Sequence, residues 1–379
     1  MASDDAPVRL DAFAPYQRLL AQATRQRRLL SVHWELTHRC NERCRHCYLE
    51  VLPPHRRPAD ELTTAEGLAL LDQVTALGAL YLTLSGGEIF VRRDWREIAA
   101  AAHSHRFVLR IFTNGRAITP VCAAQLAALQ PYAVEISVYG VDAATHDTIT
   151  QVPGSFAQTR RAFTLLAAHG VRTVLKTPLM TSNIDQVDAL RDLAATLGAT
   201  FRYDLILTPR RDGNRVPLRY ALGYADLVRH YRRTLTAAPA LSVAGCRLCN
   251  VGHNALAITP NGDVYPCLEL PLVVGNIRHT PLRTIWEAAP GWAVLTALAG
   301  GALPICGACP LGALCGRCHG AARHETGDLL APATAHCTRA LAQRQALIDQ
   351  DLIASDALPL NAHLAALKQQ LDVRGLSET

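Results

Sequence analysis

The sequence has no run of apolar residues long enough to cross a membrane, and it has no secretory signal. A membrane-spanning helix needs about 20 consecutive apolar residues. The first five residues include two aspartates, where a secretory signal carries basic residues, and no apolar segment follows them. These absences predict a cytoplasmic protein that does not associate with a membrane.

Lysine is also nearly absent. Of the 38 basic residues only Lys176 and Lys368 are lysines, and the net charge is +6. The arginines are scattered along the chain, in pairs such as Arg232-Arg233, and many alanines accompany them. This pattern is typical of a bias in nucleotide composition and of solvated faces, and not of a selected basic tract. We therefore expect no nucleic-acid partner.

Cysteine, by contrast, is frequent and unevenly distributed. Of the twelve cysteines, three lie between residues 40 and 47, one is Cys122, and eight lie between residues 246 and 337. In a long chain with no secretory signal, such clusters favour metal binding over a disulfide scaffold. Cys122 falls in a predicted helix, away from the other cysteines, and is expected to be a small buried hydrophobe.

Cys40, Cys44 and Cys47 follow an apolar, strand-like segment with the spacing C-x3-C-x2-C. Their thiolates can hold three irons of a four-iron cluster. Because such a cluster normally takes four cysteines, the shortfall indicates an open iron site for a substrate or cosubstrate. The alternative is a zinc site, for which His38 or His46 could supply a fourth ligand.

This spacing, followed by the aromatic residue Tyr48, resembles the signature of the radical S-adenosylmethionine (SAM) superfamily. The resemblance implies an enzyme with a [4Fe-4S] cluster that binds SAM at its open iron. It further implies that SAM is cleaved reductively to methionine and a 5′-deoxyadenosyl radical. That radical abstracts hydrogen from an unactivated C–H bond of the substrate.

Strand-like apolar segments alternate with helical patterns from residue 31 to about residue 235. The predicted strands are residues 31–37, 79–84, 107–112, 133–139, 172–177 and 200–207. The predicted helices that follow them are residues 64–77, 94–103, 120–129, 155–169, 185–198 and 224–235. This alternation predicts parallel βαβ units. Six units predict an α/β fold, a partial (β/α)6 TIM-like barrel, with its site on the loops after the strands.

Several of these loops carry candidate SAM ligands. Gly86 and Gly87 allow a ligand to approach the backbone closely, and Glu88 can accept a hydrogen bond from an ammonium group. The family resemblance implies that this motif binds the amine of SAM. The other cofactor-binding candidates, on the cysteine loop or the same rim, are Tyr48, Asn114, Ser137, Arg160 and Lys176.

These other candidates have different expected contacts. Ser137 could bond a ribose hydroxyl, and Arg160 could reach a carboxylate. For Asn114 the alternative is a turn-forming role. For Arg160 the alternative is solvent exposure, the commoner fate of arginine.

The carboxy-terminal cysteines resemble the SPASM extension of many radical SAM enzymes, and the small Cys-rich domain that it forms. Cys249, Gly262 and Cys267 fit its C-x9–15-G-x4-C element. The later run fits C-x2-C-x5-C, with two residues in place of three before Cys318. The resemblance implies two auxiliary [4Fe-4S] clusters, the first held by Cys246, Cys249, Cys267 and Cys318. The second would be held by Cys306, Cys309, Cys315 and Cys337. Two structural zinc ions are the alternative.

Four regions are expected in the chain. They are an N-terminal segment at 1–29, the radical SAM partial barrel at 30–237, the SPASM-like domain at 238–340 and a helical segment at 341–379. Within the SPASM-like domain, Asn261-Gly262 between two β-rich runs predicts a hairpin with a two-residue loop.

The resemblance implies that the enzyme matures a ribosomally made peptide, by a C–C or thioether crosslink or by epimerisation. One alternative substrate is a small metabolite or a tetrapyrrole precursor, and another hypothesis is a non-enzymatic metal-binding or electron-transfer scaffold. Besides the peptide, the expected partner is an electron donor of flavodoxin or ferredoxin type. Residues 1–29 are too few for a leader-recognition module, so we also expect a separate leader-peptide recognition protein.

Overall fold

The computed structural model describes residues 14–238, 251–293, 295 and 303–377. The strands in these residues form one large sheet. Six strands in chain order are β1 Ser31–Thr37, β2 Tyr81–Gly86, β3 Val108–Thr113, β4 Ala133–Ser137, β5 Thr173–Pro178 and β6 Thr200–Asp204. Each of the six is parallel to the next. All six predicted strands are therefore present, although the sixth ends three residues earlier than expected.

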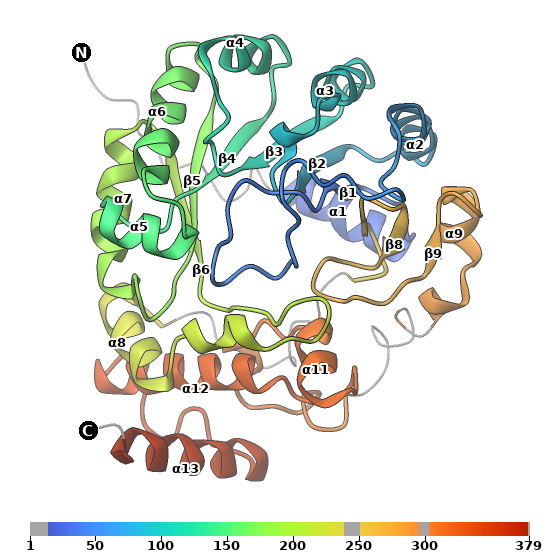
Figure 1. Cartoon of the computed structure of the whole chain (residues 1–379). Coiled ribbons are helices and arrows are strands. Elements are labelled where there is room, and N and C mark those ends of the chain that lie inside the picture. The colour runs from blue at the N-terminus through green and yellow to red at the C-terminus, as the bar shows by residue number, and fades with distance from the viewer. Residues whose placement is uncertain (1–13, 239–250, 294, 296–302, 378–379) are drawn as a thin grey trace.

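The helices between these strands lie outside the curved sheet (Figure 1). The predicted helices are present as α2 Thr64–Ala76, α3 Trp95–Ser104, α4 Pro120–Ala128, α6 Ser155–Ala167, α7 Val187–Thr196 and α8 Tyr224–Thr234, and α1 Ala14–Arg25 precedes the sheet. Together with the parallel strands they confirm the predicted partial (β/α)6 TIM-like barrel.

One helix of the barrel, α5 at Ala143–Thr150, was not predicted. It has eight residues and is rich in threonine, which lowers helix propensity. Its start is stabilised by the Asp142 carboxylate, which accepts a hydrogen bond from the Thr145 backbone N–H at 2.8 Å. This cap was the signal in the sequence that could have identified the helix.

The side chains of β1 face the main apolar core on one side of the strand and the barrel interior on the other. Side chains alternate along a strand, and Val32, Trp34 and Leu36 are fully buried in the main apolar core. The Trp34 ring packs so closely on α2 that a Cβ at Gly67 would lie 2.8 Å from it. His33, on the opposite face, lines a cavity inside the barrel. The barrel interior is therefore free for polar side chains.

The sheet continues past the predicted barrel. A seventh strand, β7 Ala255–Ile258, is parallel to β1, and it is followed by β8 Asp263–Tyr265 and β9 Gly275–Asn276, both in antiparallel pairing. The full order is β6-β5-β4-β3-β2-β1-β7-β8-β9. The Cys-rich region thus shares one sheet with the barrel, and a domain boundary at residues 237/238 stays a prediction.

The hairpin between β7 and β8 is present, but its predicted two-residue loop was wrong. Four residues, 259–262, join the two strands. The Thr259 N–H donates to the Asp263 carbonyl at 3.0 Å, and the Gly262 N–H donates to the Thr259 carbonyl at 3.0 Å. Gly262 has φ of +88°, so it closes a longer turn, and the Asn261 amide bonds the Asp263 carboxylate at 2.9 Å.

The carboxy-terminal part adds helices α9 Leu282–Ala288, α11 His319–Thr326, α12 Thr334–Asp349 and α13 Ala362–Ser377. In Figure 1, α12 runs beside α8 and α13 lies below it. Leu227, Val228 and Tyr231 of α8 share an apolar cluster with Ala342 and Ala346 of α12. No helix in the described ranges is both long and apolar enough to span a bilayer.

Candidate active site

A cavity of about 330 Å³ lies at the carboxyl ends of the barrel strands. Nine of the site residues expected from the sequence line it, namely Cys40, Cys44, Cys47, Tyr48, Gly86, Gly87, Asn114, Ser137 and Lys176. They come from the loops or ends of β1 to β5. The expectation that these loops converge on one rim therefore agrees with the geometry.

The cysteine loop is anchored at both ends. Cys40 N–H donates to the Leu52 carbonyl at 2.8 Å, where the chain returns from the loop. At the far side of the loop, the N–H groups of Arg43 and Arg45 donate to the Thr150 and Ile149 carbonyls at 3.1 and 3.0 Å. These carbonyls end α5, and helix ends leave such groups unbonded. The short helix that the sequence did not reveal thus supports the cysteine loop.

Gly86 and Gly87 are required by the chain itself. A Cβ at Gly86, where φ is +129°, would lie 2.2 Å from the Thr37 carbonyl oxygen, and one at Gly87 would lie 2.3 Å from the Arg39 oxygen. Two hydrogen bonds of 2.8 Å, from the N–H groups of Gly87 and Glu88, join the same two carbonyls. The close approach predicted for a ligand is therefore made first by the start of the cysteine loop.

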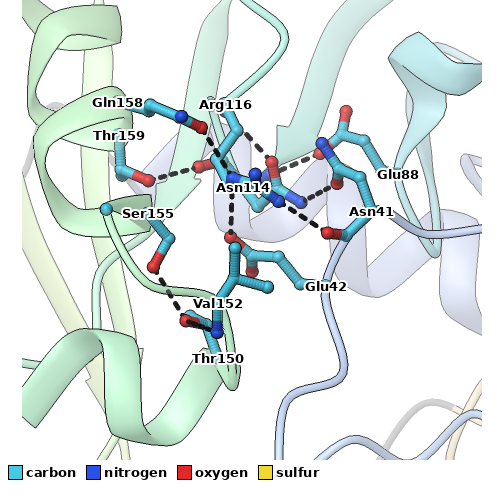
Figure 2. A network of polar contacts seen from close by, with 12 residues as sticks. Asn41, Glu42, Glu88, Asn114, Arg116, Thr150, Val152, Ser155, Gln158 and Thr159 are labelled. Atoms are coloured by element: carbon cyan, nitrogen blue, oxygen red, sulfur yellow. Dashed lines mark hydrogen bonds and ion pairs between the residues drawn. The ribbon is translucent and has the colours of Figure 1, made fainter.

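Glu88 lies behind the cavity wall and is fully buried. Its carboxylate accepts hydrogen bonds from the Thr113 hydroxyl at 2.9 Å and the Phe90 N–H at 3.1 Å. It also accepts the Asn114 N–H at 2.8 Å (Figure 2). Burial raises the pKa of Glu88, and the two backbone donors oppose that shift. The Thr113 hydroxyl lies 2.9 Å from both carboxylate oxygens, so each oxygen faces two donor contacts.

A second part of the same network holds the cysteine loop against β3 (Figure 2). The Asn114 side-chain amide donates to the Asn41 side-chain oxygen at 2.6 Å. The Arg116 guanidinium donates to the Asn41 carbonyl at 2.5 Å and lies 3.8 Å from the buried Glu42 carboxylate. Burial raises the pKa of Glu42 to about 7, while the Cys44 thiol and Arg116 oppose the rise. Sequence analysis missed both Arg116 and Glu42.

The three thiols suit a metal cluster. Burial raises the pKa of all three, and the charges of Glu88 and Glu42 add to the rise at Cys40 and Cys44 respectively. Thiolates are the metal-binding form, so this donor set needs a positively charged group to stabilise it. The irons of a cluster would supply that charge, and the three sulfur donors open onto one cavity.

The remaining predicted residues differ in their surroundings. Lys176 is 3.7 Å from the Glu135 carboxylate and 3.9 Å from the centre of the Phe112 ring, on the cavity wall. Ser137 forms a hydrogen bond with Tyr139. Arg160 is exposed on α6, with its guanidinium 5.7 Å from the centre of the Phe156 ring and away from the cavity wall.

Two acidic groups that the sequence did not single out also line the cavity. Asp204 ends β6, and Glu269 belongs to the Cys-rich region. Burial by the surrounding protein and the charge of Asp204 raise the pKa of Glu269 to about 7. The Cys-rich region therefore contributes directly to the wall of the barrel cavity.

The auxiliary cysteines are only partly described. Cys246 and Cys249 lie outside the described residues. Cys309, Cys315 and Cys337 share one apolar cluster, whereas Cys318 packs in another with residues of α11, where its sulfur accepts the Ala321 N–H at 3.4 Å. Cys267 packs against the main core and Cys306 is buried. Cys122 is buried in α4, as predicted.

A second group missed by sequence analysis supports Tyr48. Glu35 of β1 is fully buried and accepts the Tyr48 hydroxyl at 2.6 Å and an Arg211 N–H at 2.8 Å, with His38 at 3.3 Å. Burial alone would raise the pKa of Glu35. The hydrogen bond from His38 and the charge and hydrogen bond of Arg211 outweigh it and lower the pKa to about 2. Glu35 thus connects the cysteine loop to the loop after β6.

Replacing Glu35 tests this connection. In Glu35→Gln, Arg211 loses its buried counterion, which should cost about 3–5 kcal/mol. Because the folded-state pKa is depressed from 4.5 to about 2, the carboxylate stabilises the fold fully above about pH 4.5. That contribution is lost as the pH falls toward 2.

The free energy of unfolding of each protein is measured by urea denaturation at about pH 7 and about pH 3.5. The difference in the free energy of unfolding between wild type and Glu35→Gln should be about 1 kcal/mol smaller at the lower pH. Tyr48→Phe, which removes one neutral hydrogen bond, should cost only about 1 kcal/mol. An equal difference at both pH values would contradict the assignment of the charge to Glu35.

Comparisons with known proteins agree with this geometry. The profile of the Radical SAM superfamily matches residues 34–194, and that of SPASM, an iron-sulfur cluster-binding domain, matches residues 249–310. Mycofactocin maturase MftC of Mycobacterium tuberculosis (strain ATCC 25618 / H37Rv) is 32% identical over 295 residues, covering 72% of this chain and 74% of that protein. AdoMet-dependent heme synthase of Methanosarcina barkeri is 28% identical over 332 residues, covering 79% of this chain and 93% of that protein.

Solved structures show the same fold. The structure of anSMEcpe with bound AdoMet superimposes with a TM-score of 0.64 at 15% identity, over 89% of this chain and 98% of that one. Streptococcus suis SuiB bound to precursor peptide SuiA gives a TM-score of 0.57 at 15% identity, over 78% and 74%. With three thiols on one loop facing a barrel cavity, and with these matches, the chain belongs to the radical SAM superfamily and carries a SPASM iron–sulfur domain.

Proposed function

We propose that this enzyme modifies a ribosomally made peptide, by a carbon–carbon or thioether crosslink or by epimerisation. The observation that carries the proposal is the convergence of Cys40, Cys44, Cys47 and Gly86-Gly87 on one cavity that the Cys-rich region also lines. The relatives support a peptide, since they include the maturase MftC and the bacteriocin biosynthesis protein AlbA of Bacillus subtilis, 28% identical over 275 residues. Solved structures of SuiB and anSMEcpe contain bound peptides.

The shape of the barrel also favours a large substrate. Strand β6 ends the sheet in the described part of the chain, and four of its five residues are exposed. Its last residue, Asp204, lines the cavity. The sheet has two edges in the described part of the chain, β6 and β9, and is therefore not a closed barrel. We expect a peptide to reach the cavity past the β6 edge. A leader peptide would be presented by a separate recognition protein.

In this proposal Cys40, Cys44 and Cys47 would ligate a [4Fe-4S] cluster. With SAM at its open iron, the reduced cluster would supply the one electron that cleaves SAM to methionine and the 5′-deoxyadenosyl radical. Gly86 and Gly87 would present backbone groups to the methionyl end of SAM, and Glu88, behind this part of the wall, would accept a hydrogen bond from its ammonium. Tyr48, Asn114, Ser137 and Lys176 would contact the rest of the cosubstrate, whereas Arg160 lies away from the cavity wall. The walls exclude water from the reactive carbon.

The other eight cysteines would hold two auxiliary [4Fe-4S] clusters, in the division implied by the family resemblance. The shared apolar surroundings of Cys309, Cys315 and Cys337 support the second set. If the product is a crosslink, these clusters would take one electron from the substrate radical. An electron donor of flavodoxin or ferredoxin type would reduce the first cluster.

A second candidate function is the processing of a tetrapyrrole. It is favoured by the heme synthase of Methanosarcina barkeri, of which this chain covers 93%. Both candidates use the same radical chemistry and differ in what enters the cavity.

The cluster assignment predicts the iron content. Three four-iron clusters correspond to about twelve irons per chain after anaerobic reconstitution. Replacing Cys40, Cys44 and Cys47 together by alanine should remove about four irons and abolish SAM cleavage. Cys122→Ala, in a buried position away from the cavity, should retain both. Zinc with little iron in anaerobically prepared protein would overturn the assignment.

The proposed SAM contact of Glu88 predicts a loss of affinity. Glu88→Gln removes a charge-assisted hydrogen bond worth about 1.5–3 kcal/mol, so SAM binding should weaken by about tenfold or more with the first cluster retained. SAM affinity is measured by equilibrium binding, and iron is assayed in the same samples. Glu97→Gln, an exposed change on α3, is the control. Unchanged affinity would leave Glu88 with a purely structural role.

The substrate is tested by co-expression with small open reading frames that neighbour the gene. Mass spectrometry of the products should show one peptide that has lost about two hydrogens if a crosslink forms. An unchanged mass with deuterium taken up from solvent indicates epimerisation. If no peptide changes while SAM turnover couples to a porphyrin, the tetrapyrrole function replaces the first proposal.

A further inference from the structure

The cysteine loop has a second exposed side, away from the SAM cavity. A separate cavity of about 390 Å³ lies there, and Cys44 and Cys47 line both cavities, whereas Cys40 belongs to the central one. The loop is therefore one residue thick between the two spaces. A metal cluster held by Cys44 and Cys47 would therefore lie close to the outer side of the cysteine loop.

This outer cavity has a basic rim. Arg43, Arg45 and Arg210 line it, against a single acidic residue, Glu50. Among the described residues, no hydrogen bond or ion pair joins these three guanidinium groups to a carboxylate. Some other surface arginines have carboxylate partners, namely Arg191, Arg229, Arg232, Arg233 and Arg283, and others such as Arg93 and Arg96 have none among the described residues. Three arginines that have no carboxylate partner in the described part of the chain thus lie together around the outer side of the cysteine loop.

The floor of the outer cavity is apolar. Leu49, Val51, Val216 and Tyr220 line it, and Val216 is 36% exposed. The loop that carries Val216 is fixed to the cysteine loop, since the Arg211 N–H donates to the Tyr48 carbonyl at 3.0 Å. An apolar centre within a charged rim is typical of a protein-binding surface. Electron-transfer complexes bury a small area, and opposite charges guide the two proteins together.

We propose that this face, formed by Arg43, Arg45, Arg210 and the apolar floor, binds an acidic one-electron carrier protein of flavodoxin or ferredoxin type. The carrier gives one electron to the cluster at Cys44 and Cys47, and so is oxidised by one electron while the cluster is reduced by one. No proton or bond is exchanged. The inference rests on the proposed cluster at Cys40, Cys44 and Cys47.

Two features favour a redox carrier over a peptide segment on this face. SAM and the substrate would occupy the central cavity, so the electron has to arrive from another side of the cluster. The outer cavity is the other described space that both Cys44 and Cys47 reach. A carrier with acidic groups around its redox centre would match the three arginines and place that centre over the apolar floor.

The test compares cluster reduction in the reconstituted full-length enzyme and in the double variant Arg43→Gln/Arg45→Gln. Reduced flavodoxin is one donor, and reduced methyl viologen, a small cation that needs no docking, is the other. Reduction is followed by the loss of cluster absorbance under anaerobic conditions. Arg93→Gln/Arg96→Gln, two exposed changes at the start of α3, is the matched control.

With flavodoxin at low salt, the Arg43/Arg45 variant should be reduced at least about tenfold more slowly than wild type, because charge steering changes association rates by 10–10³. The difference should shrink toward 1 M salt, where the Debye length is about 3 Å. With methyl viologen, wild type, variant and control should be reduced at the same rate and should cleave SAM equally.

Three results would overturn the inference. The first is an unchanged rate with flavodoxin, and the second is an equal slowing with methyl viologen, which would place the effect on the cluster. The third is weaker binding of the peptide substrate with flavodoxin reduction intact, which would assign the face to the peptide. If wild type holds no cluster or does not cleave SAM with methyl viologen, the proposed function itself has failed, and that outcome is distinct from the other three.

Discussion

The arrangement of the site depends on one buried carboxylate. Glu88 forms no ion pair with any residue that the structure describes, and its carboxylate accepts hydrogen bonds from the Thr113 hydroxyl and two backbone N–H groups. Its own N–H holds the Arg39 carbonyl, at the start of the cysteine loop. One residue thus joins the ends of β1, β2 and β3. Leaving these buried donors unsatisfied costs about 1–3 kcal/mol each, so the spacing of the rim is strongly maintained.

That constraint changes the meaning of the glycines before it. The sequence suggested that Gly86 and Gly87 lack side chains so that a ligand can approach. The structure shows that the first need is internal, because a Cβ at either position would overlap a carbonyl of the neighbouring loop. Both functions are compatible, since the two residues also line the cavity. The Gly86-Gly87 motif therefore holds the start of the cysteine loop and also forms part of the cavity wall.

The structural features that depend on residues close together in the sequence could be predicted from local sequence patterns. The six barrel strands, their helices and the convergence of their loops follow from apolar alternation and from the rule that parallel strands end at one edge. The Glu35–Arg211 pair could not be found in this way, because the two residues are 176 positions apart. Nor could Glu269, which reaches the cavity only because β7 extends the sheet beside β1. Such contacts arise from tertiary structure and leave no periodic trace in the sequence.

The same reasoning applies to charge. Along the sequence the arginines are scattered, and that scattering indicated no basic surface. Folding brings Arg210 beside Arg43 and Arg45 on the outer side of the cysteine loop, while the carboxylates of Glu42 and Glu88 lie close to its thiols. The loop therefore separates a positive outer face from an acidic interior. Since charges that are far apart in sequence add their fields once they are close in space, the polarity across this loop belongs to the fold and not to the composition.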